Sequence, residues 1–309
     1  MNEHVILEAR NVSKTYNRDG QKISANRDIS FCINNGEVAG LLGPNGAGKT
    51  TIIKQLVNLV TPDTGDVFYK SINLRENPGI MRGRCSILLE GMRNVYHYLT
   101  GRGNLIYFAL LNGVPLEKAK DRASDLLKRM GLWQAKDKYA FTYSSGMNRK
   151  LAIATCLINE PELIILDEPT SGLDVVAVED LAELIRGLSR EHGRTFLIAS
   201  HDMRFIERVC STVLWLKDGR LVMRGGVEEI KKLNKNKSVV VRIPASAEAE
   251  AFFKKEGISP EQKSGAVLPV RLFLPKDNSV FSALASRFEI LDIEKEDSDF
   301  EAIFKEVAK

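Results

Sequence analysis

A glycine-rich loop lies between a short apolar run and a segment with helical spacing. It reads Gly43, Pro44, Asn45, Gly46, Ala47, Gly48, Lys49 and Thr50, with Thr51 next. Glycines let backbone N–H groups close around phosphate oxygens, and the N-terminus of the following helix adds positive potential. In such a loop the lysine meets the β- and γ-phosphates and the Thr50 hydroxyl can bind Mg²⁺. The loop therefore predicts a site for a nucleoside triphosphate.

Two adjacent carboxylates, Asp167 and Glu168, follow the apolar run 163–166. Taken alone, such a pair is more often the solvated end of a strand. Next to a phosphate loop, Asp167 is placed to hold Mg²⁺ through water and Glu168 to polarise the attacking water. The pair therefore predicts hydrolysis of the bound triphosphate.

Strand and helix patterns alternate around these residues. The expected strands cover 5–9, 29–33, 38–42, 163–166, 195–199 and 213–216, and the expected helices cover 51–59, 150–158 and 176–190. This alternation predicts an α/β fold whose sheet is mainly parallel. Residues 99–140 contain two further helical patterns and predict an inserted helical lobe.

The last part of the chain has a separate pattern. The lysine-rich stretch 231–237 predicts a short link. Strands are expected at 239–243, 270–274 and near Ile290, and helices at 247–255, 279–287 and the end of the chain. We therefore expect a main domain over 1–230 and a small α+β accessory domain over 238–309.

Composition excludes several classes of protein. The chain has 309 residues, 44% hydrophobic and 27% charged, which is typical of a globular protein. Lys and Arg total 44 against 40 Asp and Glu, so no nucleic-acid partner is expected. The apolar run 105–111 is far shorter than the ~20 residues that cross a bilayer. The four cysteines of the chain form no Cys-x-x-Cys pair, which predicts reduced thiols.

Three further motifs accompany the loop and the acidic strand, in a fixed order: Tyr143-Ser144-Ser145-Gly146-Met147, Pro169-Thr170-Ser171-Gly172-Leu173-Asp174 and Ile198-Ala199-Ser200-His201-Asp202. Over about residues 5–225 this set resembles the ATP-binding subunit of ABC transporters. The resemblance implies an α/β P-loop ATPase core with a mainly parallel sheet, an antiparallel β subdomain and a helical lobe at about 91–160.

The resemblance also implies roles for single residues. Tyr16 would stack on adenine, and Ser144 and Gly146 would contact the γ-phosphate held by the opposite subunit. Asp174 would lie at the dimer seam. His201 would sense the γ-phosphate and act in catalysis with Lys49 and Glu168. The alternatives are a capped turn at Ser144, an ordinary exposed histidine, and a tyrosine packed on the sheet.

Two departures from the usual motifs stand out. Glu90 occupies a position where the family usually has Gln, which adds negative charge beside a triphosphate while still offering a ligand to Mg²⁺ or water. The Tyr-Ser-Ser-Gly-Met motif differs from the common Leu-Ser-Gly-Gly-Gln. Together with residues 90–101 and the acidic, aromatic ending 299–304, these features look like the drug, antibiotic and polysaccharide exporter branch, whose membrane protein is a separate chain.

The function implied is that of a peripheral ATPase at the cytoplasmic face of the membrane. Two subunits, more readily a homodimer than a heterodimer, would close on two ATP with Mg²⁺ and drive a multi-span permease docked near Glu90 and residues 91–101. The alternative is a soluble ABC ATPase acting on ribosomes or DNA. A single cassette, the absence of a coiled-coil insertion and the dispersed cysteines favour transport. The accessory domain would regulate, dimerise, touch the partner or simply stabilise the fold.

Overall fold

The computed structural model describes residues 4–18, 20–90, 94–233, 237–258, 266–274 and 277–296. The chain divides into two compact units, residues 1–227 and residues 228–309. No helix in these described ranges is long and apolar enough to span a membrane. Residues 91–93, the ending 299–304 and the expected final helix lie outside the described residues.

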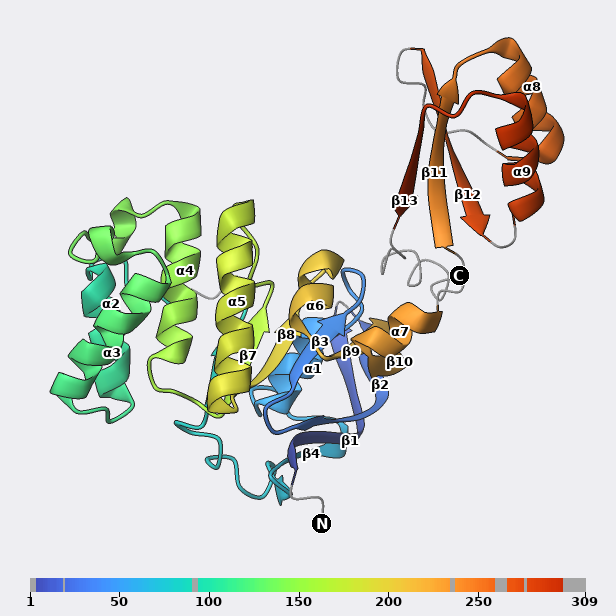
Figure 1. The fold of residues 1–309 in the computed structure, drawn as a ribbon. Coiled ribbons are helices and arrows are strands. Elements are labelled where there is room, and N and C mark those ends of the chain that lie inside the picture. Colours follow the sequence, from blue (N-terminus) through green and yellow to red (C-terminus); the bar gives the residue numbers. More distant parts are fainter. Residues whose placement is uncertain are drawn as a thin grey trace. The chain divides into compact units, whose positions relative to one another are not determined.

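The first unit contains two β-sheets and most of the helices (Figure 1). Its elements are β1 (Val5–Arg18), β2 (Gln21–Asn34), β3 (Val38–Leu42), α1 (Lys49–Leu56), β4 (Thr64–Tyr69), β5 (Ile72–Asn73), β6 (Cys85–Leu88), α2 (Gly101–Leu111), α3 (Leu116–Arg129), α4 (Ser145–Leu157), β7 (Leu163–Asp167), α5 (Val175–His192), β8 (Thr195–Ala199), α6 (Met203–Val209), β9 (Thr212–Lys217) and β10 (Arg220–Gly226), with short 3₁₀ turns at Trp133–Ala135 and Ala140–Thr142.

The larger sheet has the order β10-β9-β3-β8-β7-β6 and is parallel except for β10. The smaller sheet, β2-β1-β4-β5, is antiparallel. Ile52, Ile53 and Leu56 of α1 belong to one buried cluster with side chains of both sheets, while α4, α5 and α6 contact β6, β8 and β3. The expected α/β architecture with an antiparallel subdomain is confirmed.

Strands β1 and β2 are much longer than the sequence indicates. Their pairing is interrupted by several register shifts between Ala9 and Thr15. Asn11 and Asp28 adopt positive φ angles of 52° and 50° there. Such bulges break the alternation of apolar and polar residues on which strand prediction depends.

The helical lobe groups α2, α3 and α4 at one end of the first unit (Figure 1). Helix α4 starts at Ser145, five positions before the expected start, because the Ser144 hydroxyl accepts a hydrogen bond from the Met147 N–H at 3.2 Å. An N-terminal serine cap of this kind stabilises a helix by about 1 kcal/mol. The segment from 97 to 100 pairs with 139–141 through backbone hydrogen bonds.

The second unit is an α+β arrangement with its own core. Helix α7 (Val227–Leu233) leads into β11 (Lys237–Pro244), α8 (Ala247–Glu256), β12 (Val267–Leu274), α9 (Asn278–Arg287) and β13 (Asp292–Glu296). The strands form an antiparallel sheet in the order β12-β11-β13, and Val241, Phe253 and Leu284 are fully buried between sheet and helices. The stretch 231–237 was expected as a link, but its first three residues continue α7.

Candidate functional site

The glycine-rich loop runs from the end of β3 to the start of α1, as the pattern predicts. Gly48 has a φ of 101°, which favours glycine. A Cβ at Gly48 would lie 2.3 Å from the Ala25 carbonyl oxygen, and one at Gly43 would lie 2.4 Å from that of Leu216. The loop therefore packs against β2 and β9 so closely that side chains are excluded at both positions.

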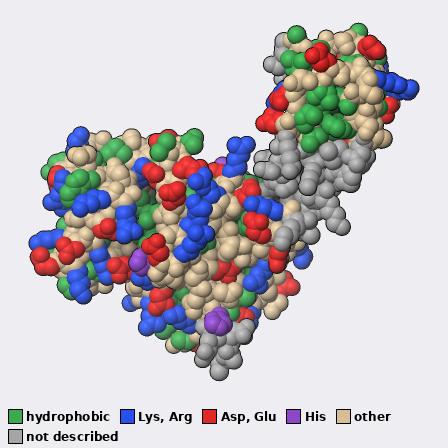
Figure 2. All heavy atoms as spheres, in the orientation of Figure 1, with side chains coloured by type: hydrophobic (Ala, Val, Ile, Leu, Met, Phe, Trp, Pro, Cys, Tyr) green, Lys and Arg blue, Asp and Glu red, His purple; other side chains and the backbone are tan. Residues whose placement is uncertain are grey.

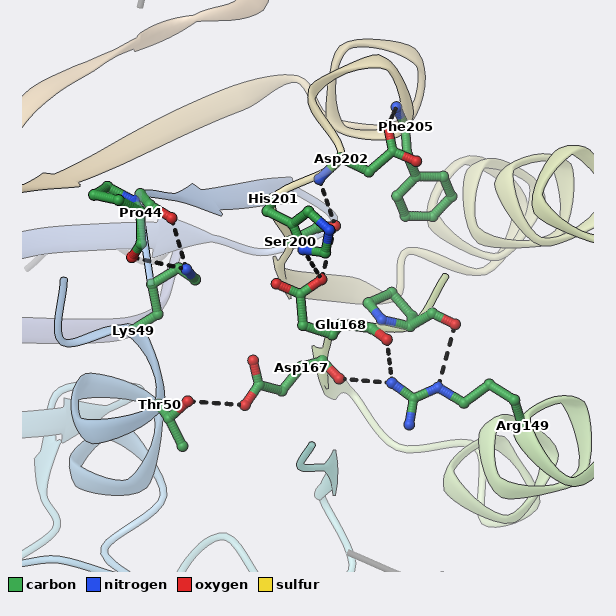
Figure 3. A network of polar contacts seen from close by, with 12 residues as sticks. Pro44, Lys49, Thr50, Arg149, Asp167, Glu168, Ser200, His201, Asp202 and Phe205 are labelled. Atoms are coloured by element: carbon green, nitrogen blue, oxygen red, sulfur yellow. Dashed lines mark hydrogen bonds and ion pairs between the residues drawn. The ribbon is translucent and has the colours of Figure 1, made fainter. Parts of the chain in front are cut away.

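Lys49 and Thr50 open α1 at this loop. The Lys49 ammonium donates hydrogen bonds to the carbonyl oxygens of Gly43 and Pro44, at 2.6 and 3.2 Å. The Thr50 hydroxyl donates to Asp167 Oδ2 at 3.2 Å (Figure 3). These contacts place the lysine over the loop and join the loop to the carboxyl end of β7.

Asp167 is the last residue of β7 and is almost completely buried, with 1% of its surface exposed. Burial raises the pKa of its carboxyl group, and hydrogen bonds from Thr50 and from the Glu90 backbone N–H oppose that rise. A buried carboxylate beside a hydroxyl offers the hard oxygen donors that Mg²⁺ prefers, and a cation would offset the cost of burying the charge. Thr50 and Asp167 therefore fit a magnesium ion.

Glu168 follows directly, with its side chain only 7% exposed and a left-handed φ of 51°. Its N–H donates to the Ala199 carbonyl at 2.8 Å, which ties this backbone to the end of β8. Its Oε2 accepts a hydrogen bond from the Ser200 hydroxyl at 3.3 Å and contacts His201 Nδ1 at 2.9 Å (Figure 3). The left-handed backbone is uncommon for a residue with a Cβ and is typical of functional sites.

Sequence reasoning missed two residues of this cluster. Ser200 contacts the Glu168 carboxylate, and Arg149 in α4 donates to the backbone carbonyls of residues 167–169. Ser200 lies within the motif 198–202, beside His201. Arg149 follows the motif 143–147 by two positions, and what sets it apart is its contacts with the carbonyls of residues 167–169, which the sequence does not signal.

The predicted site residues separate into two groups. Lys49, Thr50, Asp167, Glu168 and His201 meet at the carboxyl ends of β3, β7 and β8, and Glu90 joins them through its backbone N–H. The Glu90 residue is exposed. The first group is thus one cluster drawn from four separate segments of the chain.

The second group lies around the loop 169–174. Gly146 packs so closely on it that a Cβ would lie 3.1 Å from the Gly172 carbonyl oxygen. Asp174 caps α5 by accepting the Ala177 N–H at 2.8 Å, as Ser144 caps α4. The cap at Ser144 is the structural alternative stated for that residue, and Asp174 caps α5 in the same way, although each side chain keeps further hydrogen-bonding capacity.

Tyr16 lies on β1, paired with Ile23 of β2, and 39% of its surface is exposed. The neighbouring pairs of the same hairpin bring in Asn26, whose amide donates to the Gly48 carbonyl at 3.3 Å. Lys14 lies 5.8 Å from the Tyr16 ring centroid. The ring is therefore an accessible flat surface on the hairpin that backs the phosphate loop.

Comparison with known proteins assigns this chain to a family. The model of the ABC transporter family matches residues 26–171. The ABC transporter ATP-binding protein NatA of Bacillus subtilis is 34% identical over 218 residues, which cover 71% of this chain and 88% of NatA. The bacitracin transport ATP-binding protein BcrA of Enterococcus faecalis is 34% identical over 230 residues, covering 74% of this chain and 72% of BcrA. The methionine import ATP-binding protein MetN of Pasteurella multocida is 31% identical, covering 73% and 66% of the two chains.

Solved structures agree with this assignment. A dimeric ATP-binding cassette in a post-hydrolysis state, bound to ADP and phosphate, superposes with a TM-score of 0.67 at 26% identity and covers 72% of this chain and 99% of its own. The protein belongs to the ATP-binding subunits of the ABC transporter family. It is an ABC ATPase.

Proposed function

We propose that two copies of this chain close on two ATP molecules with Mg²⁺ and drive a separate membrane permease for export. The copies would bind head to tail, so that each nucleotide meets the loop 43–51 of one copy and Ser144 and Gly146 of the other. Asp174 would lie at the seam between them. The relative bound to ADP and phosphate is dimeric, which supports this assembly.

The chemistry proposed for each group follows from its position. Mg²⁺, held by Thr50 and Asp167 with Glu90 able to bind it or its water, would neutralise charge on the phosphates. Lys49 exchanges its contacts with the loop carbonyls for phosphate oxygens. The Glu168 carboxylate orients and deprotonates the attacking water, His201 reports the γ-phosphate to it, and Tyr16 stacks on adenine.

An exposed aromatic surface on the helical lobe carries the proposal of a membrane partner. Tyr98, Tyr139 and Phe141 are 85%, 53% and 58% exposed. The Phe141 ring lies 5.7 Å from Tyr139 and 6.2 Å from Tyr98, so the three form one patch. A contiguous exposed apolar patch is typical of a protein–protein contact. The permease would dock here, beside Glu90 and residues 94–101, and hold the ATPase at the cytoplasmic face of the membrane.

Export is favoured over import by two features. The relatives at 34% identity include a bacitracin transport protein, whereas the methionine import proteins match at 28–31%. The motif Tyr143-Ser144-Ser145-Gly146-Met147 and Glu90 point to the same branch. Transport of a labelled antibiotic or polysaccharide precursor into inverted membrane vesicles would support export, and ATP-dependent loss from them would support import.

The test of the proposal is to purify tagged Glu168→Gln from solubilised membranes with ATP and Mg²⁺ and to identify what accompanies it by mass spectrometry. A stoichiometric multi-span membrane protein is the expected result. Lys49→Ala is the matched control, because a variant that cannot close on ATP should recover less of the partner. Tyr98→Asp should reduce recovery while keeping ATPase activity.

Recovery of ribosomal or DNA-associated proteins instead would overturn the transport function. The soluble alternative has little support in the structure, because basic and acidic side chains are interspersed on the face shown in Figure 2. The relatives described above also carry transport names.

Residues 238–309 are proposed as an accessory domain that is not needed for hydrolysis. The support is that the core of the second unit is made from its own strands and helices. A chain ending at residue 237 should therefore keep its basal ATPase rate. Loss of nucleotide binding in that truncation would contradict a separate domain.

A further inference from the structure

Arg149 links the helix that starts at the motif 143–147 to the backbone of the hydrolytic strand. Its Nη2 donates to the Asp167 carbonyl at 2.9 Å and also to the Glu168 carbonyl, and its Nε donates to the Pro169 carbonyl at 3.3 Å. Figure 3 shows the guanidinium facing this turn from α4. One side chain therefore satisfies three consecutive carbonyls where β7 ends.

Holding the Arg149 guanidinium at this turn costs free energy, because the charged group is partly removed from water. Burial lowers the pKa of Arg149, while the nearby charges of Asp167, Glu90 and Glu168 oppose that decrease. A guanidinium is suited to the task because its donors are fixed in a planar fork. Lysine carries its three N–H donors on one rotatable nitrogen and so lacks the fixed, spread donors of the guanidinium.

The turn that Arg149 holds contains a residue with a left-handed backbone conformation. Glu168 adopts a φ of 51°, which costs roughly 1 kcal/mol or more for a residue with a Cβ and persists only where neighbours enforce it. The Ala199 carbonyl holds the Glu168 N–H from one side. Arg149 holds the Glu168 carbonyl from the other.

We propose that Arg149 is a positioning residue for hydrolysis, which fixes the Glu168 carboxylate by clamping the backbone of residues 167–169. The proposal rests on the proposed role of Glu168 as the base. Helix α4 begins one residue after Ser144. A nucleotide that binds at Ser144 and shifts α4 would therefore also shift Glu168 of the same chain through this clamp.

The test is a double-mutant cycle on the full chain, with Arg149→Met and Glu168→Gln, measured as steady-state kcat and KM and as single-turnover ATP hydrolysis. Arg149→Met should lower kcat by about 10–100-fold, the effect of misplacing a catalytic group by ~1 Å, with KM for ATP nearly unchanged. In the Glu168→Gln background it should cause almost no further loss, because the two residues act as one unit. Arg149→Lys should lie between wild type and Arg149→Met.

Arg122→Met is the matched control. Arg122 also reaches from the helical lobe to the β7 segment, donating to the Ile158 carbonyl at 3.4 Å and to Glu160 Oε2 at 2.7 Å. Its loss should leave kcat close to wild type. If Arg149→Met does not fold, as judged by thermal unfolding, the cycle is run with Arg149→Lys.

The outcomes separate the two hypotheses. Equal losses from the arginine variant in both backgrounds, or an unchanged kcat, would overturn the positioning role and leave the base intact. A Glu168→Gln variant with normal turnover would instead remove the proposed function of Glu168. A fall in nucleotide affinity equal to the fall in kcat would assign Arg149 to binding.

Discussion

The two ends of β7 carry nearly the same residue types and do different things. At each end a glutamate adopts a φ of 51°, Glu160 before the strand and Glu168 after it. At each end an arginine from the helical lobe donates to backbone carbonyls, Arg122 to residue 158 and Arg149 to residues 167–169. The residue type and backbone conformation of Glu160 and Glu168, and the arginine beside each, therefore do not explain why the two ends differ.

Burial distinguishes them. The Glu160 side chain is 52% exposed and forms surface ion pairs, whereas that of Glu168 is 7% exposed. Charges in solvent interact weakly, while buried charges act strongly on what is bound beside them. What an acidic residue at a strand end can do thus depends on whether it lies at the amino or the carboxyl edge of the parallel sheet. Here the glycine-rich loop also lies at the carboxyl edge.

The contrast between Glu160 and Glu168 is tested most strongly by neutralising each glutamate in turn. Glu168→Gln should lower kcat by about 10²–10⁴-fold, the usual value of a general base, while ATP binding and ATP-dependent dimers persist. Glu160→Gln should change kcat less than about twofold, because an exposed ion pair contributes little. Steady-state hydrolysis and size-exclusion chromatography with ATP measure both, and similar rates for the two variants would refute the contrast.

A smaller effect is expected on metal binding. Asp167→Asn removes the buried charge beside Thr50, so the Mg²⁺ concentration for half-maximal activity should rise by about 10-fold or more. Glu162→Gln, at the other end of the strand, removes a half-exposed carboxylate bonded to Lys70 and Tyr69 and should leave that concentration unchanged. A Mg²⁺ titration of ATPase activity compares them. An unchanged requirement in Asp167→Asn would remove this residue from the metal site.

The smallest effect concerns stability at the exposed end. Arg122→Met removes a partly exposed pair with Glu160, and we expect a loss of roughly 0.5–1 kcal/mol in the free energy of unfolding. Urea denaturation measures this directly. A loss above ~3 kcal/mol would mean that the pair behaves as a buried one.

The sequence predicts the loop, the acidic strand and the α/β core because each depends on local pattern. Lys49, Thr50 and Asp167 meet as expected, since the ends of neighbouring parallel strands share an edge. The length of β1 and the role of Arg149 were not predictable. Bulges near Asn11 destroy the alternation, and nothing local shows which of several arginines will turn inward. The continuation of α7 into the lysine-rich stretch was missed because its charged residues resemble a linker.

The close packing behind the phosphate loop determines which substitutions the chain can accept. Gly48 and Gly43 abut the carbonyl oxygens of Ala25 and Leu216. In a saturation library selected only for folded protein, without nucleotide or transport, both positions should already be restricted to glycine. At Gly46, where a Cβ would meet nothing within 4 Å, restriction should be weaker and come chiefly from its φ of 81°. Glycine at these two loop positions would then be required by the packing of the domain and not by ligand binding.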